Sequence, residues 1–269
     1  MNIDETISKY KKDGFRHPFA LAKVCQDIIL YKIVKSGFGN NVTIKGGVVM
    51  MNISNDNRRA TRDLDLDFIK YSLEDNSIRT FIDKLNHVPD NIKLEITGPI
   101  EKMKQEDYEG KRVHIYVIED TNIKSKFKLD IGVHKNLDLK QEELCFDLNS
   151  SLESVSLFVN SKEQIISEKI KSLLKHGVFS TRYKDIFDIY YLINIKTINV
   201  EKLKTLIQDY ILNDSKMYEN TFRDIYNRLN FIFTDEAYKE KLKYEKEDNW
   251  LGLPENDVIK KVLGFFKKL

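Results

Sequence analysis

The chain has 269 residues, and its 44 Lys and Arg against 42 Asp and Glu give a formal net charge of +2. This balance excludes a domain that holds nucleic acid by bulk charge alone. A hydrophobic content of 41% is enough for a packed core and excludes wholesale disorder. With Cys25 and Cys145 as its two cysteines, the chain has neither a disulfide framework nor a cysteine-rich zinc site.

Export and membrane signals are not expected either. The first residues lack the apolar core of a secretory signal. Nowhere does the sequence contain the run of about 18 apolar residues that a membrane-spanning helix needs. We therefore expect a protein of the reducing cytoplasm, without a membrane partner.

Helical and strand periodicities alternate up to about residue 155. Leu21, Val24, Ile28 and Ile29 recur at helical spacing and predict a helix over 18–35. The elements predicted next are a strand at 42–45, helical turns at 48–53, a loop at 52–62, a strand at 64–69, a helix at 73–85, and strands at 92–97, 113–119 and 126–133.

From residue 162 onward the periodicity is helical throughout. Helices are predicted at 162–175, 183–195, 200–212, 216–231, 235–246 and 255–268. The expected fold class is therefore α+β. Residues 1–155 would form a mixed sheet flanked by helices, and residues 156–269 an all-helical domain.

The segment 61–68, Thr-Arg-Asp-Leu-Asp-Leu-Asp-Phe, carries most information about function. Side chains alternate across a strand, so Asp63, Asp65 and Asp67 share one face at intervals of about 7 Å. Asp is a poor strand former, and three neighbouring carboxylates repel one another. A divalent cation is the simplest compensation, and carboxylate oxygens suit Mg²⁺ or the similar Mn²⁺. The alternative is an exposed acidic edge strand.

Gly46 and Gly47 follow the strand at 42–45 and precede the predicted helical turns. Glycines at such a junction let a phosphate approach the backbone, and a helix N-terminus offers N–H donors to it. A tight turn is the alternative interpretation. Lys45 and Arg62 add positive charge to the same stretch, although solvated surface roles would also account for them.

A further carboxylate, Asp130, interrupts an apolar strand and shares its face with Lys128. Phosphoryl transfer of the polymerase type uses two carboxylates to hold metal and a third to help activate the incoming hydroxyl. The alternative is a strand-end residue or a salt-bridge partner.

These residues resemble a known family. Gly46-Gly47, Asp63-x-Asp65 and Asp130 are similar to the nucleotidyltransferase-fold signature. The segments 165–174 and 182–190 resemble the "AEKL…L…R…RDxxDL" block of the AbiEii/MenT nucleotidyltransferase toxins of type IV toxin–antitoxin and abortive-infection systems. The resemblance covers about residues 40 to 195. It departs from the family pattern where Gly47 replaces a common Ser and Lys184 replaces Arg, and it leaves Asp67 outside the Asp-x-Asp pair.

The helical block adds two candidates, Lys169 and Asp185. Taken from the residues alone, a structural salt bridge between two helices is the favoured interpretation. The resemblance makes both residues catalytic candidates, with Lys169 reaching a triphosphate oxygen and Asp185 pairing with Lys169 or orienting the nucleotide.

The resemblance implies transfer of a nucleoside monophosphate from an NTP to an acceptor hydroxyl, with release of pyrophosphate, in a cleft between the two domains. Asp63 and Asp65 would bind Mg²⁺ or Mn²⁺, and Asp130 would be a ligand or the base. The residues implied around the nucleotide are Gly46, Gly47, Lys45, Arg62, Lys128 and Lys169. The expected acceptor is the 3′ end of tRNA, and a separately encoded antitoxin would counter the toxin. A nucleotidyltransferase acting on a small molecule such as an aminoglycoside, and a non-catalytic nucleotide- or partner-binding module, are the alternatives.

Overall fold

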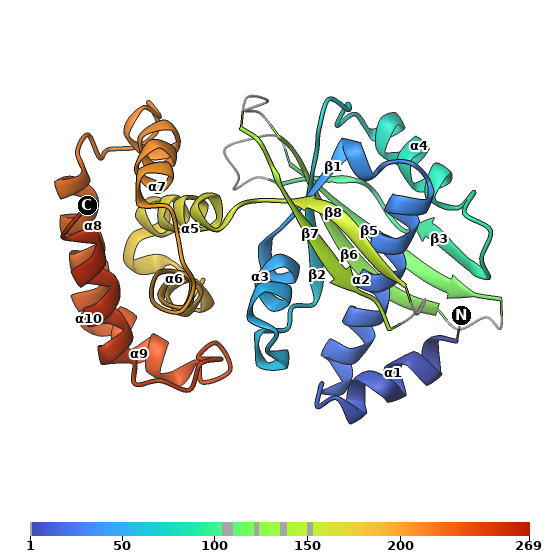
Figure 1. Cartoon of the computed structure of the whole chain (residues 1–269), viewed down its shortest axis with the longest axis horizontal. Coiled ribbons are helices and arrows are strands. Elements are labelled where there is room, and N and C mark those ends of the chain that lie inside the picture. Colours follow the sequence, from blue (N-terminus) through green and yellow to red (C-terminus); the bar gives the residue numbers. More distant parts are fainter. Residues whose placement is uncertain (1, 104–109, 121–123, 135–138, 150–152) are drawn as a thin grey trace. The chain divides into compact units, whose positions relative to one another are not determined.

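The computed structural model describes the chain except for residues 1, 104–109, 121–123, 135–138 and 150–152. The described residues form two compact units, Met1–Asn160 and Ser161–Leu269. The first unit contains a mixed sheet with helices packed on it, and the second contains helices (Figure 1). This architecture confirms the α+β fold class.

The sheet is mixed in strand direction. Its path runs β3-β5-β6-β2-β1-β8-β7, with β4 paired to β5. The pairs β2/β6 and β1/β8 are parallel, and the other pairs are antiparallel. The strands are β1 Val42–Lys45, β2 Asp63–Phe68, β3 Ile92–Ile96, β4 Glu101–Lys102, β5 Lys111–Glu119, β6 Lys124–Val133, β7 Glu142–Asp147 and β8 Ser154–Val159.

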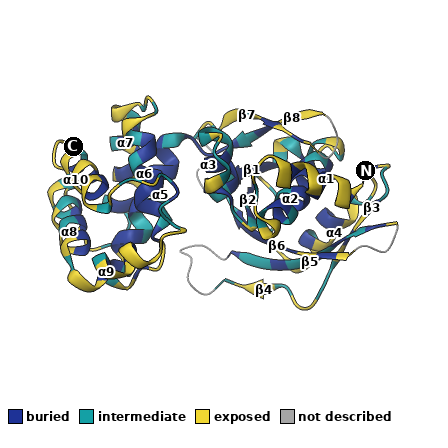
Figure 2. Cartoon of the chain, turned by 90° about the horizontal axis from the view of Figure 1, so that it is seen from below, coloured by how far each residue is buried: buried dark blue, intermediate teal, exposed yellow. Residues whose placement is uncertain are grey.

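One face of this sheet forms the core of the first unit. Leu64, Leu66 and Phe68 of β2 are fully buried there. The long helix α2 packs against β2, β6 and β8 and also contacts α1 and α4. Figure 2 shows α1, α2 and α4 on the same side of the sheet, with much of α2 coloured as buried. The helices of this unit are α1 Ile3–Lys12, α2 His17–Lys35, α3 Gly46–Ser54 and α4 Asp75–Leu85, with short 3₁₀ turns at Gly39–Asn41 and Asn57–Arg59.

The second unit is helical in its described part. Its first helix begins at a Ser161 cap, whose Oγ accepts a hydrogen bond from the backbone N–H of Gln164 at 3.3 Å. Thr221 and Asp224 form a capping box that starts α8. The helices are α5 Lys162–His176, α6 Lys184–Asn194, α7 Val200–Ile207, α8 Phe222–Thr234, α9 Glu236–Tyr244 and α10 Glu255–Phe266, with a 3₁₀ turn at Gly177–Phe179 and a π-helical turn at Gln208–Leu212.

Several predicted boundaries differ from the structure. The start predicted at residue 216 is wrong, because the capping box begins α8 at Phe222. The predicted 200–212 helix becomes π-helical from Gln208. Sequence patterns did not predict α1, β4, β7 or β8. Because β8 pairs in parallel with β1, the first unit extends to Asn160, beyond the predicted boundary at 155. No helix among the described residues is both long and apolar enough to span a membrane.

Candidate active site

The register between β2 and β6 brings the predicted carboxylates together on one face of the sheet. The two strands are parallel, with Asp65 opposite Asp130 and Asp63 opposite Lys128. Residues opposite one another on neighbouring strands point to the same face. Asp63, Asp65, Lys128 and Asp130 therefore share the face that lies opposite the buried Leu64 and Leu66.

Asp63 is held by two hydrogen-bond donors. Lys128 Nζ lies 2.7 Å from its Oδ2, and the hydroxyl of Thr61 donates to its Oδ1 at 2.7 Å. Burial by itself raises the pKa of Asp63, but the hydrogen bonds from Lys128 and Thr61 outweigh burial and lower the pKa below its ordinary value. This carboxylate is therefore ionised at neutral pH.

Arg112, which no sequence pattern singled out, holds the Asp130 carboxylate. Arg112 donates from Nε to Oδ1 at 2.8 Å and from Nη2 to Oδ2 at 2.9 Å. This bidentate pair is the strong form of a guanidinium–carboxylate contact, and the hydrogen bond to Asp130 raises the pKa of Arg112. The contact depends on the register of β5 against β6, which places Arg112 opposite Asp130.

The two glycines allow the backbone to pack closely against residues beside the carboxylates. Gly46 has a φ of +70°, and a Cβ atom added to it would lie 2.1 Å from Oδ2 of Asp65. A Cβ atom on Gly47 would lie 2.7 Å from Cβ of Thr61. The Gly-Gly pair thus lets the start of α3 approach Asp65 and Thr61 closely, besides any contact with phosphate.

Lys45 and Arg62, both predicted nucleotide contacts, have side-chain partners within the first unit. Lys45 Nζ forms an ion pair with Asp67 Oδ1 at 2.8 Å, and Asp67 is only 5% exposed. Asp67 therefore has its own neutralising cation. The guanidinium carbon of Arg62 lies 5.3 Å from the centroid of the Phe19 ring on α2. Arg62 therefore packs against α2, while the carboxylates point to the polar face of the sheet.

In the second unit, Lys169 of α5 lies between two carboxylates of α6. It forms ion pairs with Asp185 and with Asp188 Oδ2 at 2.8 Å. Asp188 is fully buried, and its Oδ1 accepts a hydrogen bond from Trp250 Nε1 at 3.0 Å. The structure thus joins the predicted pair Lys169 and Asp185 to a third residue, Asp188. Asp188 was not predicted as a site residue, although its spacing of three residues from Asp185 places both on neighbouring positions of one helix.

The chemistry of the donors on the sheet fits a divalent cation. Asp63, Asp65 and Asp130 present carboxylate oxygens, which Mg²⁺ and Mn²⁺ prefer. Two cations, Lys128 and Arg112, balance this partly buried negative charge in the structure. A bound metal ion would meet the same electrostatic need. In the described part of the chain, no three acidic, His or Cys side chains stand close enough together to form a ready-made metal cluster.

A mixed sheet with carboxylates on adjacent strands, beside a Gly-Gly turn that opens a helix, is the arrangement of a nucleotidyltransferase. The family model described as "Nucleotidyl transferase AbiEii toxin, Type IV TA system" matches residues 28–256, and the chain belongs to this family. The protein is therefore a nucleotidyltransferase of a toxin–antitoxin system. Membership implies an NTP substrate and an antitoxin partner, and nucleotidyltransferases generally use a divalent metal.

Comparison with individual proteins adds little to the family assignment. No curated protein matches the chain. Among solved structures, the chain is similar to an antigenic nucleotidyltransferase-like protein from Paracoccidioides brasiliensis, with 18% sequence identity and a TM-score of 0.44. That match covers 79% of this chain and 91% of the other.

Proposed function

We propose that this toxin uses a divalent metal to transfer a nucleoside monophosphate from an NTP to the 3′-terminal hydroxyl of tRNA. The observation that carries the metal-dependent part is the β2/β6 register, which sets Asp63 and Asp65 beside Asp130 on one face. The choice of tRNA rests on the similarity of the 165–174 and 182–190 segments to the toxin block. The expected setting is the cytoplasm, where NTP and tRNA are both available.

Asp63 and Asp65 are the proposed metal ligands. The lowered pKa of Asp63 keeps its carboxylate ionised at neutral pH, as a ligand must be. When bound, Mg²⁺ or Mn²⁺ would neutralise phosphate charge and align the reacting oxygens. Lys128, which pairs with Asp63, is the proposed cation that stands near the nucleotide phosphates.

In the proposed reaction, the acceptor hydroxyl oxygen forms a bond to the α-phosphorus of the NTP. The bond from that phosphorus to the oxygen bridging to the β-phosphate breaks, and pyrophosphate leaves with the electron pair. Asp130 either ligates the metal or accepts the hydroxyl proton. Arg112 holds its carboxylate in place through both oxygens, and each oxygen retains a further lone pair.

The phosphates have two proposed sources of positive charge. The first is the N-terminus of α3 at Gly46 and Gly47, where backbone N–H groups lack intrahelical partners. The second is Lys169, which Asp185 and Asp188 hold at a defined position. Lys45 and Arg62 remain proposed nucleotide contacts, although each has a protein partner in the structure.

The test is incubation of the purified chain with total tRNA, Mg²⁺ or Mn²⁺, and each α-³²P-labelled NTP in turn, beside an Asp65→Ala control. Labelled tRNA with the wild type and none with Asp65→Ala would support the proposal and identify the nucleotide. Absence of label with every NTP, from protein that still binds nucleotide, would contradict tRNA as the acceptor. A parallel assay with aminoglycosides would then test the small-molecule alternative.

A further inference from the structure

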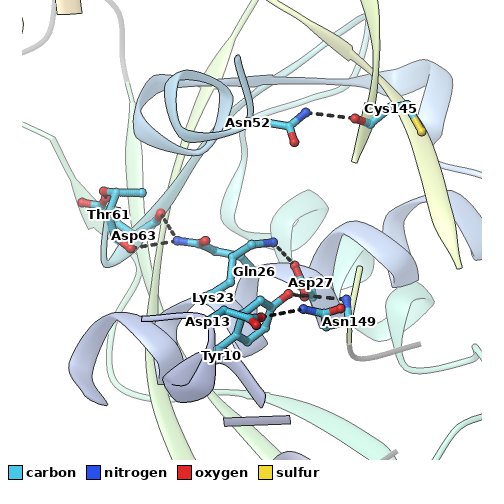
Figure 3. Close-up of polar contacts among 10 residues, drawn as sticks. All are labelled: Tyr10, Asp13, Lys23, Gln26, Asp27, Asn52, Thr61, Asp63, Cys145 and Asn149. Carbon is cyan, nitrogen blue, oxygen red and sulfur yellow. Dashed lines mark hydrogen bonds and ion pairs between the residues drawn. The ribbon is translucent and has the colours of Figure 1, made fainter. Parts of the chain in front are cut away.

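Gln26 makes an unusual contact with the segment that leads into β2. It lies in the middle of α2 and is 1% exposed, among apolar residues such as Cys25, Ile28 and Ile29. Its Nε2 donates hydrogen bonds to the backbone carbonyls of Thr61 and Asp63, both at 3.1 Å. Figure 3 shows this side-chain amide reaching both residues. The buried Gln26 amide therefore binds the backbone carbonyls on both sides of Arg62.

These two carbonyls lie where the sheet offers less support. The ladder between β1 and β2 runs from the Val42–Phe68 pair to the Lys45–Asp65 pair. Thr61 and Asp63 lie beyond that end, since β1 is followed by α3. The Gln26 amide supplies two hydrogen bonds at this point and so extends the restraint on β2 past its last pairing with β1.

Thr61 connects the restrained backbone to the Asp63 carboxylate. The Thr61 hydroxyl donates to Asp63 Oδ1 at 2.7 Å. Gly47 also restrains Thr61, because a Cβ atom there would lie 2.7 Å from the Thr61 Cβ atom. Gln26 thus restrains the backbone from which the Thr61 hydroxyl and the Asp63 carboxylate both project.

Gln26 is itself on firmly anchored backbone. The next residue, Asp27, is fully buried and accepts hydrogen bonds from Lys23 and from the Tyr10 hydroxyl of α1. Gln26 also keeps an unpaired acceptor, because its buried Oε1 has no hydrogen-bond partner among the described residues. Leaving a buried oxygen unpaired is unfavourable. The two hydrogen bonds from Nε2 give a reason for Gln, rather than an apolar residue, at this buried position.

We infer that Gln26 is a positioning residue that holds Asp63 in place to bind the divalent metal ion. This inference rests on the proposed function, in which Asp63 is a metal ligand. Residues that orient metal ligands through hydrogen bonds typically change metal affinity about 10- to 100-fold when they are replaced. We expect a change of about 10-fold here, because Lys128 still restrains the Asp63 carboxylate after the amide is lost.

The experiment compares Mn²⁺ binding by Gln26→Met and Asn86→Leu, followed through the electron paramagnetic resonance signal of the free ion. Both substitutions remove a side-chain amide that makes two hydrogen bonds to backbone in or just before a strand. Asn86 binds the backbone of Leu94 in β3, away from the carboxylates. Both variants are expected to lower Tm. Only Gln26→Met is expected to raise the Kd for Mn²⁺ by about 10-fold.

Three further variants separate the possible results. Thr61→Val removes the hydroxyl that bonds Asp63 and is expected to weaken Mn²⁺ binding, whereas Thr61→Ser is expected to preserve it. If Gln26→Met does not fold, Mn²⁺ binding by the two Thr61 variants tests whether Asp63 must be held in place. Asp63→Asn reports on the metal site itself.

Loss of Mn²⁺ binding in Asp63→Asn together with unchanged binding in Gln26→Met and Thr61→Val would overturn the positioning role and leave the proposed function standing. Unchanged binding in Asp63→Asn would overturn the metal assignment and the positioning role with it.

Discussion

Gly46 and Asp65 are in such close contact that a Cβ atom on Gly46 would lie 2.1 Å from the carboxylate oxygen Oδ2. The requirement for glycine here is therefore double, since the φ of +70° also disfavours any side chain. The contact links the start of α3 directly to a proposed metal ligand.

Replacing Gly46 by Ala is expected to displace the Asp65 carboxylate and abolish nucleotidyl transfer. Gly37→Ala is the matched control, because Gly37 has a φ of +80° but no atom within 4 Å of an added Cβ. Gly37→Ala should lose about 1–2 kcal/mol of unfolding free energy from backbone strain alone and keep its activity. Denaturant unfolding and the transfer assay would measure both effects. Full activity in Gly46→Ala would contradict the role given to this contact.

Arg112 is expected to support activity through the geometry of Asp130. Arg112→Lys keeps the charge but not the bidentate contact. The variant should fold with a modestly lowered Tm, since Arg112 is partly exposed but its partner Asp130 is buried. Its kcat should fall by up to about 10²-fold, the effect expected when a reacting group is displaced by about 1 Å. Lys111→Arg, in the neighbouring position, is a control that should change neither quantity. A wild-type kcat in Arg112→Lys would contradict the prediction.

Asp188 is expected to hold Lys169 in position for the NTP. Asp188→Asn retains an oxygen for Trp250 but removes one of the charges that face Lys169. We expect a loss of about 1–3 kcal/mol in unfolding free energy and a raised KM for NTP.

The matched control for Asp188→Asn is Asp214→Asn. Asp214 pairs at 2.6 Å with Lys171, which lies on α5 like Lys169. The side chain of Asp214 is 20% exposed. A partly exposed pair contributes less, about 1 kcal/mol at most, and KM for NTP should not change. Equal KM values for Asp188→Asn and the wild type would show that the contact is purely structural.

The Asp63–Lys128 pair predicts a pH dependence of stability. The folded-state pKa of Asp63 is lowered, so the ionised carboxylate stabilises the fold above the ordinary carboxyl pKa of about 3.9. That contribution is lost as pH falls from this value through the lower folded-state pKa. The difference in unfolding free energy between wild type and Asp63→Asn should therefore be larger at pH 7 than at pH 3. A difference independent of pH would contradict the prediction.

Sequence patterns of short range account for much of the site. The alternation of Asp63, Leu64 and Asp65 predicted both a strand and its polar face, and the predicted 42–45 strand coincides with β1. Such patterns can be found from sequence because the two-residue period of a strand and the 3.6-residue period of a helix are local properties of the chain.

Tertiary structure decided which partners meet across the sheet. The register of β5 against β6 placed Arg112 opposite Asp130, and the packing of α2 brought Gln26 to Thr61. Strand β8 was missed, and its place beside β1 depends on pairing between segments more than 100 residues apart. Hydrogen bonds and ion pairs between distant segments depend on strand register and helix packing, and these are set by the burial of the whole core rather than by any local pattern.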